Sequence, residues 1–148
     1  MAKIQEKTDF TGEEHQNMLV LLKRAQEKFG HVSGEVITEV AQSLNVSIGE
    51  VYGVATFYSF LSVKPLGKNV IRVCRSLPCY LKNSQTIIES VAGEIGIKPG
   101  ETTSDGIFSF ELTNCIGTCD HAPAMLINND VHGDLTPKKI SKTLRTYS

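Results

Sequence analysis

Four cysteines, arranged as two pairs in the second half of the chain, constrain this protein more than any other feature of its sequence. Four residues separate Cys74 from Cys79, and three residues separate Cys115 from Cys119. A chain of 148 residues can bury enough apolar surface to fold without disulfide bonds. Paired cysteines in such a chain are typical of metal sites and redox sites.

Composition narrows the class of protein further. The chain has 15 basic and 16 acidic residues, a net charge of −1, and therefore lacks the positive field that attracts nucleic acid or anionic lipid. Its apolar runs all fall short of the ~20 residues needed to span a bilayer, and residues 1–6 do not resemble a signal peptide. We therefore expect a soluble cytoplasmic protein, in a compartment that keeps thiols reduced.

Residues 1–65 are predicted to form a helical bundle. Apolar residues recur there at helical spacing in three stretches, and Pro65-Leu66-Gly67 then interrupts the pattern. The first expected helix begins after a capping box at Thr11 and Glu14 and ends at Gly30. The second runs from about Glu35 to Asn45. The third runs from a capping box at Ser47 and Glu50 to about Leu61.

The third of these helices is apolar on nearly all sides, from Val51 to Phe60. Such a helix is normally buried in its own domain or covered by a partner protein. A helix-turn-helix that binds DNA is the competing interpretation, but residues 29–63 contain no Lys or Arg. Without cations near phosphate, little binding energy would be available, so the sequence argues against DNA binding.

Residues 66–148 are predicted to form a β-α-β unit followed by a β-β-α unit. Strands are expected at 70–73, at 108–112 and at 124–127, and the last of these forms a hairpin with a strand at Val131. Helices are expected at 84–95 and from Pro137, with Thr136 as the N-cap. This order fits a thioredoxin-like α/β sandwich. A β-α-β unit has a right-handed crossover and parallel strands, so both cysteine pairs should lie at one edge of the sheet.

Four thiols at one edge predict a metal site, and the spacing leaves several occupants open. Zinc commonly takes four cysteines, and a [2Fe-2S] cluster takes two cysteines at each iron. Two disulfides are disfavoured in a reducing compartment. A thiol–disulfide enzyme is disfavoured as well, because neither pair has the C-x-x-C spacing.

The segment Cys115-Ile-Gly-Thr-Cys119-Asp-His-Ala-Pro123, together with residues 53–60 and the loop from Cys74 to Cys79, resembles a known family. This is the small iron–sulfur subunit of NADH dehydrogenase (complex I). The same family serves NAD(P)-linked hydrogenases, including electron-bifurcating ones, and NAD-dependent formate dehydrogenases. The resemblance covers about residues 10–145.

The resemblance implies an N-terminal helical bundle over residues 1–65 that contributes to partner docking, and a thioredoxin-like domain over 66–148. It implies one [2Fe-2S] cluster, with Cys74 and Cys79 on one iron and Cys115 and Cys119 on the other. It also implies an electron-transfer protein whose larger partner holds FMN and NAD(P), so that the isolated chain has no activity. The alternative function is a structural zinc module that mediates protein–protein interaction.

Four further residues near the cysteines have candidate roles. Arg75 could raise the reduction potential of the cluster, and Gly117 could allow a turn that points amides at sulfur. Pro123 lies where thioredoxin-like folds often have a cis proline. His121 is interpreted as a neighbouring surface residue rather than a fifth ligand.

Overall fold

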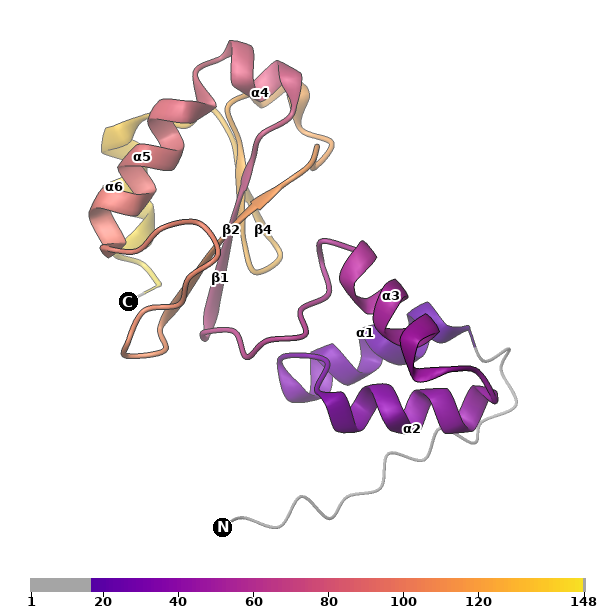
Figure 1. Cartoon of the computed structure of the whole chain (residues 1–148). Helices are drawn as coiled ribbons and strands as arrows, with labels where there is room; N and C mark the ends of the chain where they lie inside the picture. The colour runs from indigo at the N-terminus through magenta and orange to yellow at the C-terminus, as the bar shows by residue number, and fades with distance from the viewer. Residues whose placement is uncertain (1–16, 148) are drawn as a thin grey trace. The chain divides into compact units, whose positions relative to one another are not determined.

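The computed structural model describes residues 17–147, and the chain divides after Pro65 into two compact units. Three helices form the described part of the first unit, from residue 17, and a sheet with helices forms the second (Figure 1). The predicted capping box at Thr11 and Glu14 lies outside the described residues. Within residues 17–147, no helix has the length and hydrophobicity required to cross a bilayer.

The helical unit contains α1 (Met18–Phe29), α2 (Gly34–Leu44) and α3 (Ile48–Phe57). Short polar side chains cap all three N-termini by accepting hydrogen bonds from backbone N–H groups: Asn17 from Leu19, Ser33 from Val36, and Ser47 from Glu50. Gly30 and Asn45 end α1 and α2 in the left-handed conformation. These two ends, and the Ser47 cap, confirm the predicted boundaries.

Aliphatic side chains from all three helices form the core of this unit. The fully buried members include Leu22, Val40 and Val51, and Ala55 lets the helices approach closely. The three helices pack against one another in pairs. The core is therefore shared by three short helices, none of which would be stable alone.

The third helix ends at Phe57, and the prediction that it continues to Leu61 is wrong. Tyr58 has an extended backbone, and a turn follows in which the Leu61 N–H donates to the Tyr58 carbonyl. The Gln26 side chain of α1 stabilises this turn. Its amide N–H donates to the Phe60 carbonyl, and its oxygen accepts from the Ser62 N–H over 2.6 Å.

The second unit contains a four-stranded sheet in the order β2-β1-β3-β4. The strands are β1 (Asn69–Cys74), β2 (Phe108–Thr113), β3 (Met125–Ile127) and β4 (Asp130–His132). Strand β1 runs parallel to β2 and antiparallel to β3, and β3 pairs with β4 as a hairpin. The predicted order of strands along the chain, the parallel β-α-β unit and the hairpin are confirmed.

Four helical segments complete this unit: α4 (Leu77–Leu81), α5 (Ser84–Ile95), the 3₁₀ turn η1 (Cys119–His121) and α6 (Pro137–Leu144). Thr136 caps α6 as predicted, by accepting from the Lys139 N–H. The predicted cap of α5 at Ser84 is wrong. Asn83 holds the cap position in the left-handed conformation, and Ser84 is the first helical residue, almost fully buried.

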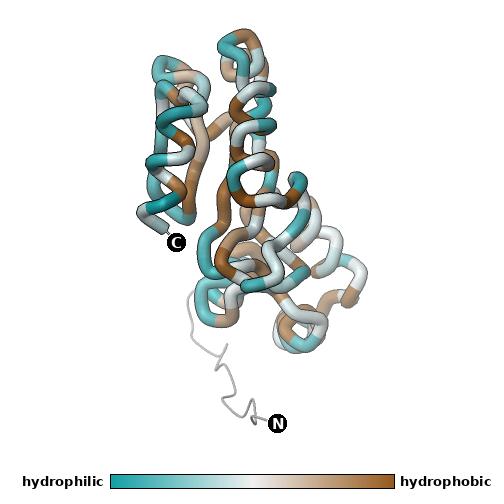
Figure 2. Tube along the Cα trace, turned by 90° about the vertical axis from the view of Figure 1, so that its left-hand side faces the viewer, coloured by the Kyte–Doolittle hydropathy of each residue, from teal (hydrophilic) through white to brown (hydrophobic). Residues whose placement is uncertain are grey.

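The core of the sheet unit lies between the sheet and the pair α5 and α6, which lie on the same side of it (Figure 1). Alternate strand residues such as Ile71, Val73 and Phe110 point into this core. Along α6, hydrophobic residues recur about once a turn among polar ones (Figure 2), and Ile140 and Leu144 are buried. This is the pattern of a helix with one buried side.

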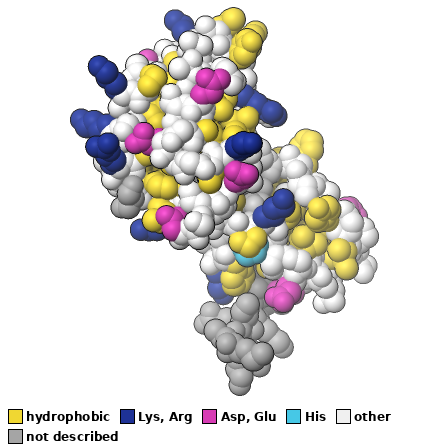
Figure 3. Space-filling model, turned by 60° about the vertical axis from the view of Figure 1, so that its left-hand side comes forward, with side chains coloured by type: hydrophobic (Ala, Val, Ile, Leu, Met, Phe, Trp, Pro, Cys, Tyr) yellow, Lys and Arg dark blue, Asp and Glu magenta, His cyan; other side chains and the backbone are white. Residues whose placement is uncertain are grey.

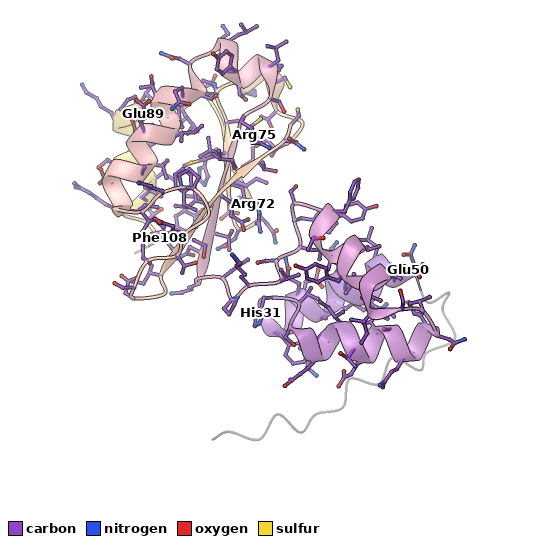
Figure 4. The ribbon with its side chains drawn as sticks, in the orientation of Figure 1. His31, Glu50, Arg72, Arg75, Glu89 and Phe108 are labelled. Carbon is purple, nitrogen blue, oxygen red and sulfur yellow. The ribbon has the colours of Figure 1, made fainter. Side chains whose placement is uncertain are left out.

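The opposite face of the sheet carries a cross-strand ion pair. Arg72 of β1 lies beside Glu111 of β2 in the parallel register, and its Nε is 3.0 Å from the Glu111 Oε2. Figure 4 labels Arg72 on this strand. The geometry makes this an ion pair rather than a hydrogen bond, because the Nε–H has no acceptor in line.

Candidate iron–sulfur site

The parallel pair of strands delivers both cysteine loops to one end of the sheet. Cys74 is the last residue of β1 and lies opposite Thr113, the last residue of β2. The Arg75 N–H donates to the Thr113 carbonyl, which extends the ladder one residue past Cys74. Cys115 follows Thr113 by two residues. The predicted placement of the two loops at one edge is therefore observed.

The first cysteine pair is buried. Cys74 and Cys79 are 1% and 2% exposed and pack with Ala124, and the partly buried Ile116 and Ala122 pack against this group. The Cys74 N–H donates to the Ala124 carbonyl over 3.1 Å, which ties the first loop to the segment before β3. These two thiols are thus held in a small apolar cluster at the end of the sheet.

The second cysteine pair is exposed. The sulfurs of Cys115 and Cys119 are 3.3 Å apart, close enough to share a hydrogen bond. Gly117, between them, has a φ of +84°, and its N–H donates to the Cys115 sulfur over 3.4 Å. The turn that was predicted to point an amide at sulfur is therefore present, and it requires a conformation that favours glycine.

Electrostatic effects connect the thiols within and between the loops. Burial raises the pKa of Cys79 to about 11, with further contributions from its hydrogen bond to Cys74 and from the charge of Cys119. The hydrogen bond from Gly117 lowers the pKa of Cys115, whereas the hydrogen bond with Cys115 raises the pKa of Cys119. Charges act between the two loops as well, since Cys119 raises the pKa of Cys79 and Cys74 raises the pKa of Cys119.

The four thiols suit an iron–sulfur cluster by their chemistry. Thiolate sulfur is a soft ligand that favours iron–sulfur clusters and zinc, and a [2Fe-2S] cluster takes two cysteines at each iron. Within residues 17–147, the structure has no group of three or more His, Cys, Asp or Glu side chains placed to hold a single metal ion. The structure presents one buried pair and one exposed pair of thiols at the same end of the sheet.

The predicted neighbours of the site lie in the first cysteine loop and just after the second. His121 is exposed, its Nδ1 is 2.8 Å from the Asp134 Oδ2 and its Nε2 is 3.4 Å from the Asp120 Oδ2. Both ring nitrogens thus face carboxylates, which fits a surface histidine. Ala122 and Pro123 are joined by a cis peptide bond. Arg75 is exposed just past the end of β1 (Figure 4).

Sequence reasoning missed the short helix α4, which contains Cys79. Proline at the second helical position after Ser76 is a start signal that would have indicated it. The helix turns Cys79 inward and leaves Leu77, Tyr80 and Leu81 exposed beside the cysteine loops. The pairing of His121 with Asp134 was also missed, because the contact crosses from η1 to the segment after β4.

A helical unit followed by an α/β unit, with four thiols at one end of a mixed sheet, defines a small protein of the ferredoxin class. The chain belongs to the thioredoxin-like [2Fe-2S] ferredoxin family, whose model matches residues 1–148. The cofactor of this family is a [2Fe-2S] cluster. The predicted family, fold class and cofactor are thus confirmed.

Among curated relatives, the E subunit of NADH-quinone oxidoreductase from Pseudomonas aeruginosa is 38% identical over 126 residues. The corresponding protein of Escherichia coli strain K12 is 40% identical over 126 residues. Each alignment covers 85% of this chain and 76% of the relative. The chain is therefore similar over most of its length to small subunits of an oxidoreductase complex.

The solved structures include an NAD+-reducing [NiFe]-hydrogenase in its air-oxidized state, which matches with a TM-score of 0.75 and 22% identity. The match covers 88% of this chain but only 22% of the hydrogenase chain. At this identity the likeness concerns the fold. It shows that both units of this chain have counterparts in a larger oxidoreductase polypeptide.

Proposed function

We propose that this chain is the electron-transfer component of a multi-subunit NAD(P)-dependent oxidoreductase of the NADH dehydrogenase or NAD-linked hydrogenase type. In this proposal its cluster exchanges single electrons with the flavin of a larger NAD(P)H-binding subunit in the cytoplasm. The observation that supports the proposal is the location of two thiol pairs in the loops at the same end of β1 and β2. The similarity to small subunits of NADH-quinone oxidoreductase supports it.

We assign Cys74 and Cys79 to one iron, and Cys115 and Cys119 to the other. A bound [2Fe-2S] cluster supplies the chemistry of accepting and releasing one electron at a time. The chain's own residues then have distinct roles. Ala124 and Ile116 exclude water from the buried thiols, and the Gly117 N–H donates to the Cys115 sulfur. Hydrogen bonds to sulfur and exclusion of water both set a cluster's reduction potential.

The hydride chemistry belongs to the partner in this proposal. The sequence lacks a G-x-G-x-x-G motif after a strand and lacks a P-loop, which are the usual signals of a dinucleotide or phosphate site. A flavin on the partner accepts the hydride of NAD(P)H and passes electrons on singly. The chain then needs only to hold its cluster and to dock close to that flavin.

The first test is anaerobic purification followed by assays of iron, acid-labile sulfide and zinc, and by EPR after reduction with dithionite. We expect two irons and two sulfides per chain, and a signal of S = 1/2 in the reduced protein. One zinc without sulfide, reproduced after anaerobic reconstitution with iron and sulfide, would instead establish a structural zinc module.

Two further experiments test the ligands and the division of labour. Serine at each of the four cysteines should abolish or alter the cluster spectrum, and an unchanged spectrum would remove that residue from the ligand set. The isolated chain should not reduce dyes with NAD(P)H, and activity should appear when the flavin-binding subunit is added. Activity of the chain alone would contradict the assignment of the flavin to the partner.

A further inference from the structure

The two thiol pairs of the site differ in how easily a cluster can reach them. Cys115 and Cys119 are exposed, and their sulfurs are 3.3 Å apart, close enough to bind one iron together. Cys74 and Cys79 are only 1% and 2% exposed. A molecule that delivers a cluster can therefore contact the second pair directly, whereas the first pair has to be uncovered before it can bind iron.

Hydrogen bonds within the second loop hold the exposed pair in place. The Gly117 N–H donates to the Cys115 sulfur over 3.4 Å. The His121 N–H donates over 3.1 Å within the turn η1, which begins at Cys119. Both contacts lie within residues 115–121, so the second loop can present its two sulfurs while the first loop stays closed.

Two different elements hold the buried pair. Cys74 is the last residue of β1, and its N–H donates to the Ala124 carbonyl over 3.1 Å. Cys79 lies on α4, and it alone is buried among the residues of that helix, all of which the structure describes. Cys74 therefore keeps its place as long as the sheet is intact, whereas Cys79 moves if α4 moves.

Helix α4 is weakly held. It has five residues, and the side chain at its N-cap, Ser76, makes no capping hydrogen bond. Leu77, Tyr80 and Leu81 are 67%, 63% and 74% exposed. Figure 3 shows hydrophobic side chains on the surface at the end of the sheet unit where Figure 1 places α4. A single helical turn with one buried side chain belongs to the least stable part of a fold and opens locally.

The segments on both sides of α4 are fixed. Before it, the Arg75 N–H extends the ladder of β1 and β2 by one hydrogen bond. After it, Asn83 has a φ of +69° and separates α4 from α5, whose Ile87 is buried in the core. Residues 76–83 can therefore open as one unit while β1 and α5 stay packed.

We propose that the cluster enters this chain through Cys115 and Cys119, and that opening of α4 then lets Cys74 and Cys79 bind the second iron. The inference rests on the ligand assignment of the proposed function. Each step exchanges one thiolate for another: an iron–sulfur bond to the donor breaks and a bond to a cysteine sulfur of this chain forms. The cysteine proton passes to the released donor thiolate, and no electron is gained or lost.

The first test separates the two pairs. The probe is the [2Fe-2S] complex of glutathione, in which the thiolates of the tripeptide hold both irons. It is added to the cluster-free chain, prepared with a chelator under reducing conditions, and the products are weighed by native mass spectrometry. We expect the double variant Cys74→Ser with Cys79→Ser to bind a cluster that keeps glutathione on one iron. The matched variant Cys115→Ser with Cys119→Ser should bind no cluster.

The second test changes the stability of α4 and leaves all four cysteines in place. Leu81 is 74% exposed, so that Leu81→Gly and Leu81→Ala remove few contacts from the folded chain. Glycine in place of alanine lowers helix formation by roughly fivefold. At saturating probe, release of the last glutathione should therefore be roughly fivefold faster in Leu81→Gly than in Leu81→Ala. Stopped-flow circular dichroism in the visible range measures this rate, because the completed site places the cluster in a chiral environment.

Three results would overturn the inference. A mixed complex with glutathione on the variant that keeps only Cys74 and Cys79 would reverse the order. Equal rates in Leu81→Gly and Leu81→Ala would remove the opening of α4, and this comparison holds even where a double serine variant fails to fold. A wild-type chain that takes no cluster from the probe, yet is loaded by iron and sulfide, would show that the exposed pair does not receive a thiolate-bound cluster. A wild-type chain that holds no cluster after either treatment would overturn the proposed function itself.

Discussion

The backbone N–H of Gly117 donates a hydrogen bond to the sulfur of Cys115 over 3.4 Å, from a residue whose φ is +84°. This contact lowers the pKa of Cys115, because it favours the thiolate over the thiol. The same donor would stabilise the extra negative charge of a reduced cluster. The backbone conformation of Gly117 should therefore influence the reduction potential of the cluster.

Gly117→Ala should shift the reduction potential of the cluster to a more negative value. Alanine at this φ is strained by about 1–2 kcal/mol, so the turn should relax and move the N–H away from sulfur. Redox titration followed by EPR measures the shift, and Gly93→Ala in α5 is a control glycine with open space around it. An unchanged potential with the cluster intact would show that this amide does not tune the site.

Glu111→Gln should destabilise the sheet unit by about 1–3 kcal/mol. The Arg72 and Glu111 side chains are only 13% and 26% exposed, and the substitution leaves a largely buried guanidinium without its counter-charge. Urea unfolding followed by circular dichroism measures the loss. The double variant Arg72→Met with Glu111→Leu should recover most of it, because no buried charge is then left. Equal losses in the single and double variants would contradict this explanation.

The contribution of His132 to the stability of the protein should fall as the pH drops below about 6.5. Burial lowers the pKa of His132 in the folded chain, against the opposing charge of Asp130. The unfolded chain, with an ordinary histidine pKa of ~6.5, therefore binds a proton first, and acid favours unfolding. Urea unfolding from pH 7.5 to 5.5 should show a shallower pH dependence in His132→Asn than in wild type. Parallel curves would exclude His132 as a contributor.

Removal of the cluster should expose two thiols to alkylation and leave two protected. Cys115 and Cys119 are exposed, whereas Cys74 and Cys79 are buried in the apolar cluster with Ala124. After treatment with a chelator under reducing conditions, iodoacetamide should label the exposed pair at least about ten times faster. Mass spectrometry of tryptic peptides measures each rate, and the untreated holoprotein should protect all four. Equal rates for both pairs would mean that the first loop opens when the cluster leaves.

Much of the local structure was predictable because its causes are local. Ser47 and Thr136 accept hydrogen bonds from N–H groups three residues later, and Gly30 and Gly96 end helices in the left-handed conformation. Such signals operate within one helical turn and can be read from neighbouring residues. The alternating pattern of residues 108–112 likewise predicted β2.

The end of α3 was predicted wrongly because its cause is remote in sequence. The stretch to Leu61 continues the helical pattern, but the Gln26 side chain of α1 holds the Phe60 carbonyl and the Ser62 N–H in a turn. Tertiary hydrogen bonds of this kind override helix propensity. The cap of α5 by Asn83 was also missed, because a left-handed asparagine is less common than a serine cap at that position.

The sequence by itself determined the order of the elements and the arrangement of two cysteine pairs around a β-α-β unit, since spacing and periodicity are properties of the chain alone. The family followed from the resemblance of the cysteine loops and residues 53–60 to known proteins. Only the tertiary structure decided which thiols are buried. Packing of Ala124 and Ile116, which lie far beyond Cys74 in the chain, covers Cys74 and Cys79 and leaves Cys115 and Cys119 exposed. Burial depends on what other segments bring to a residue, and a local pattern cannot contain it.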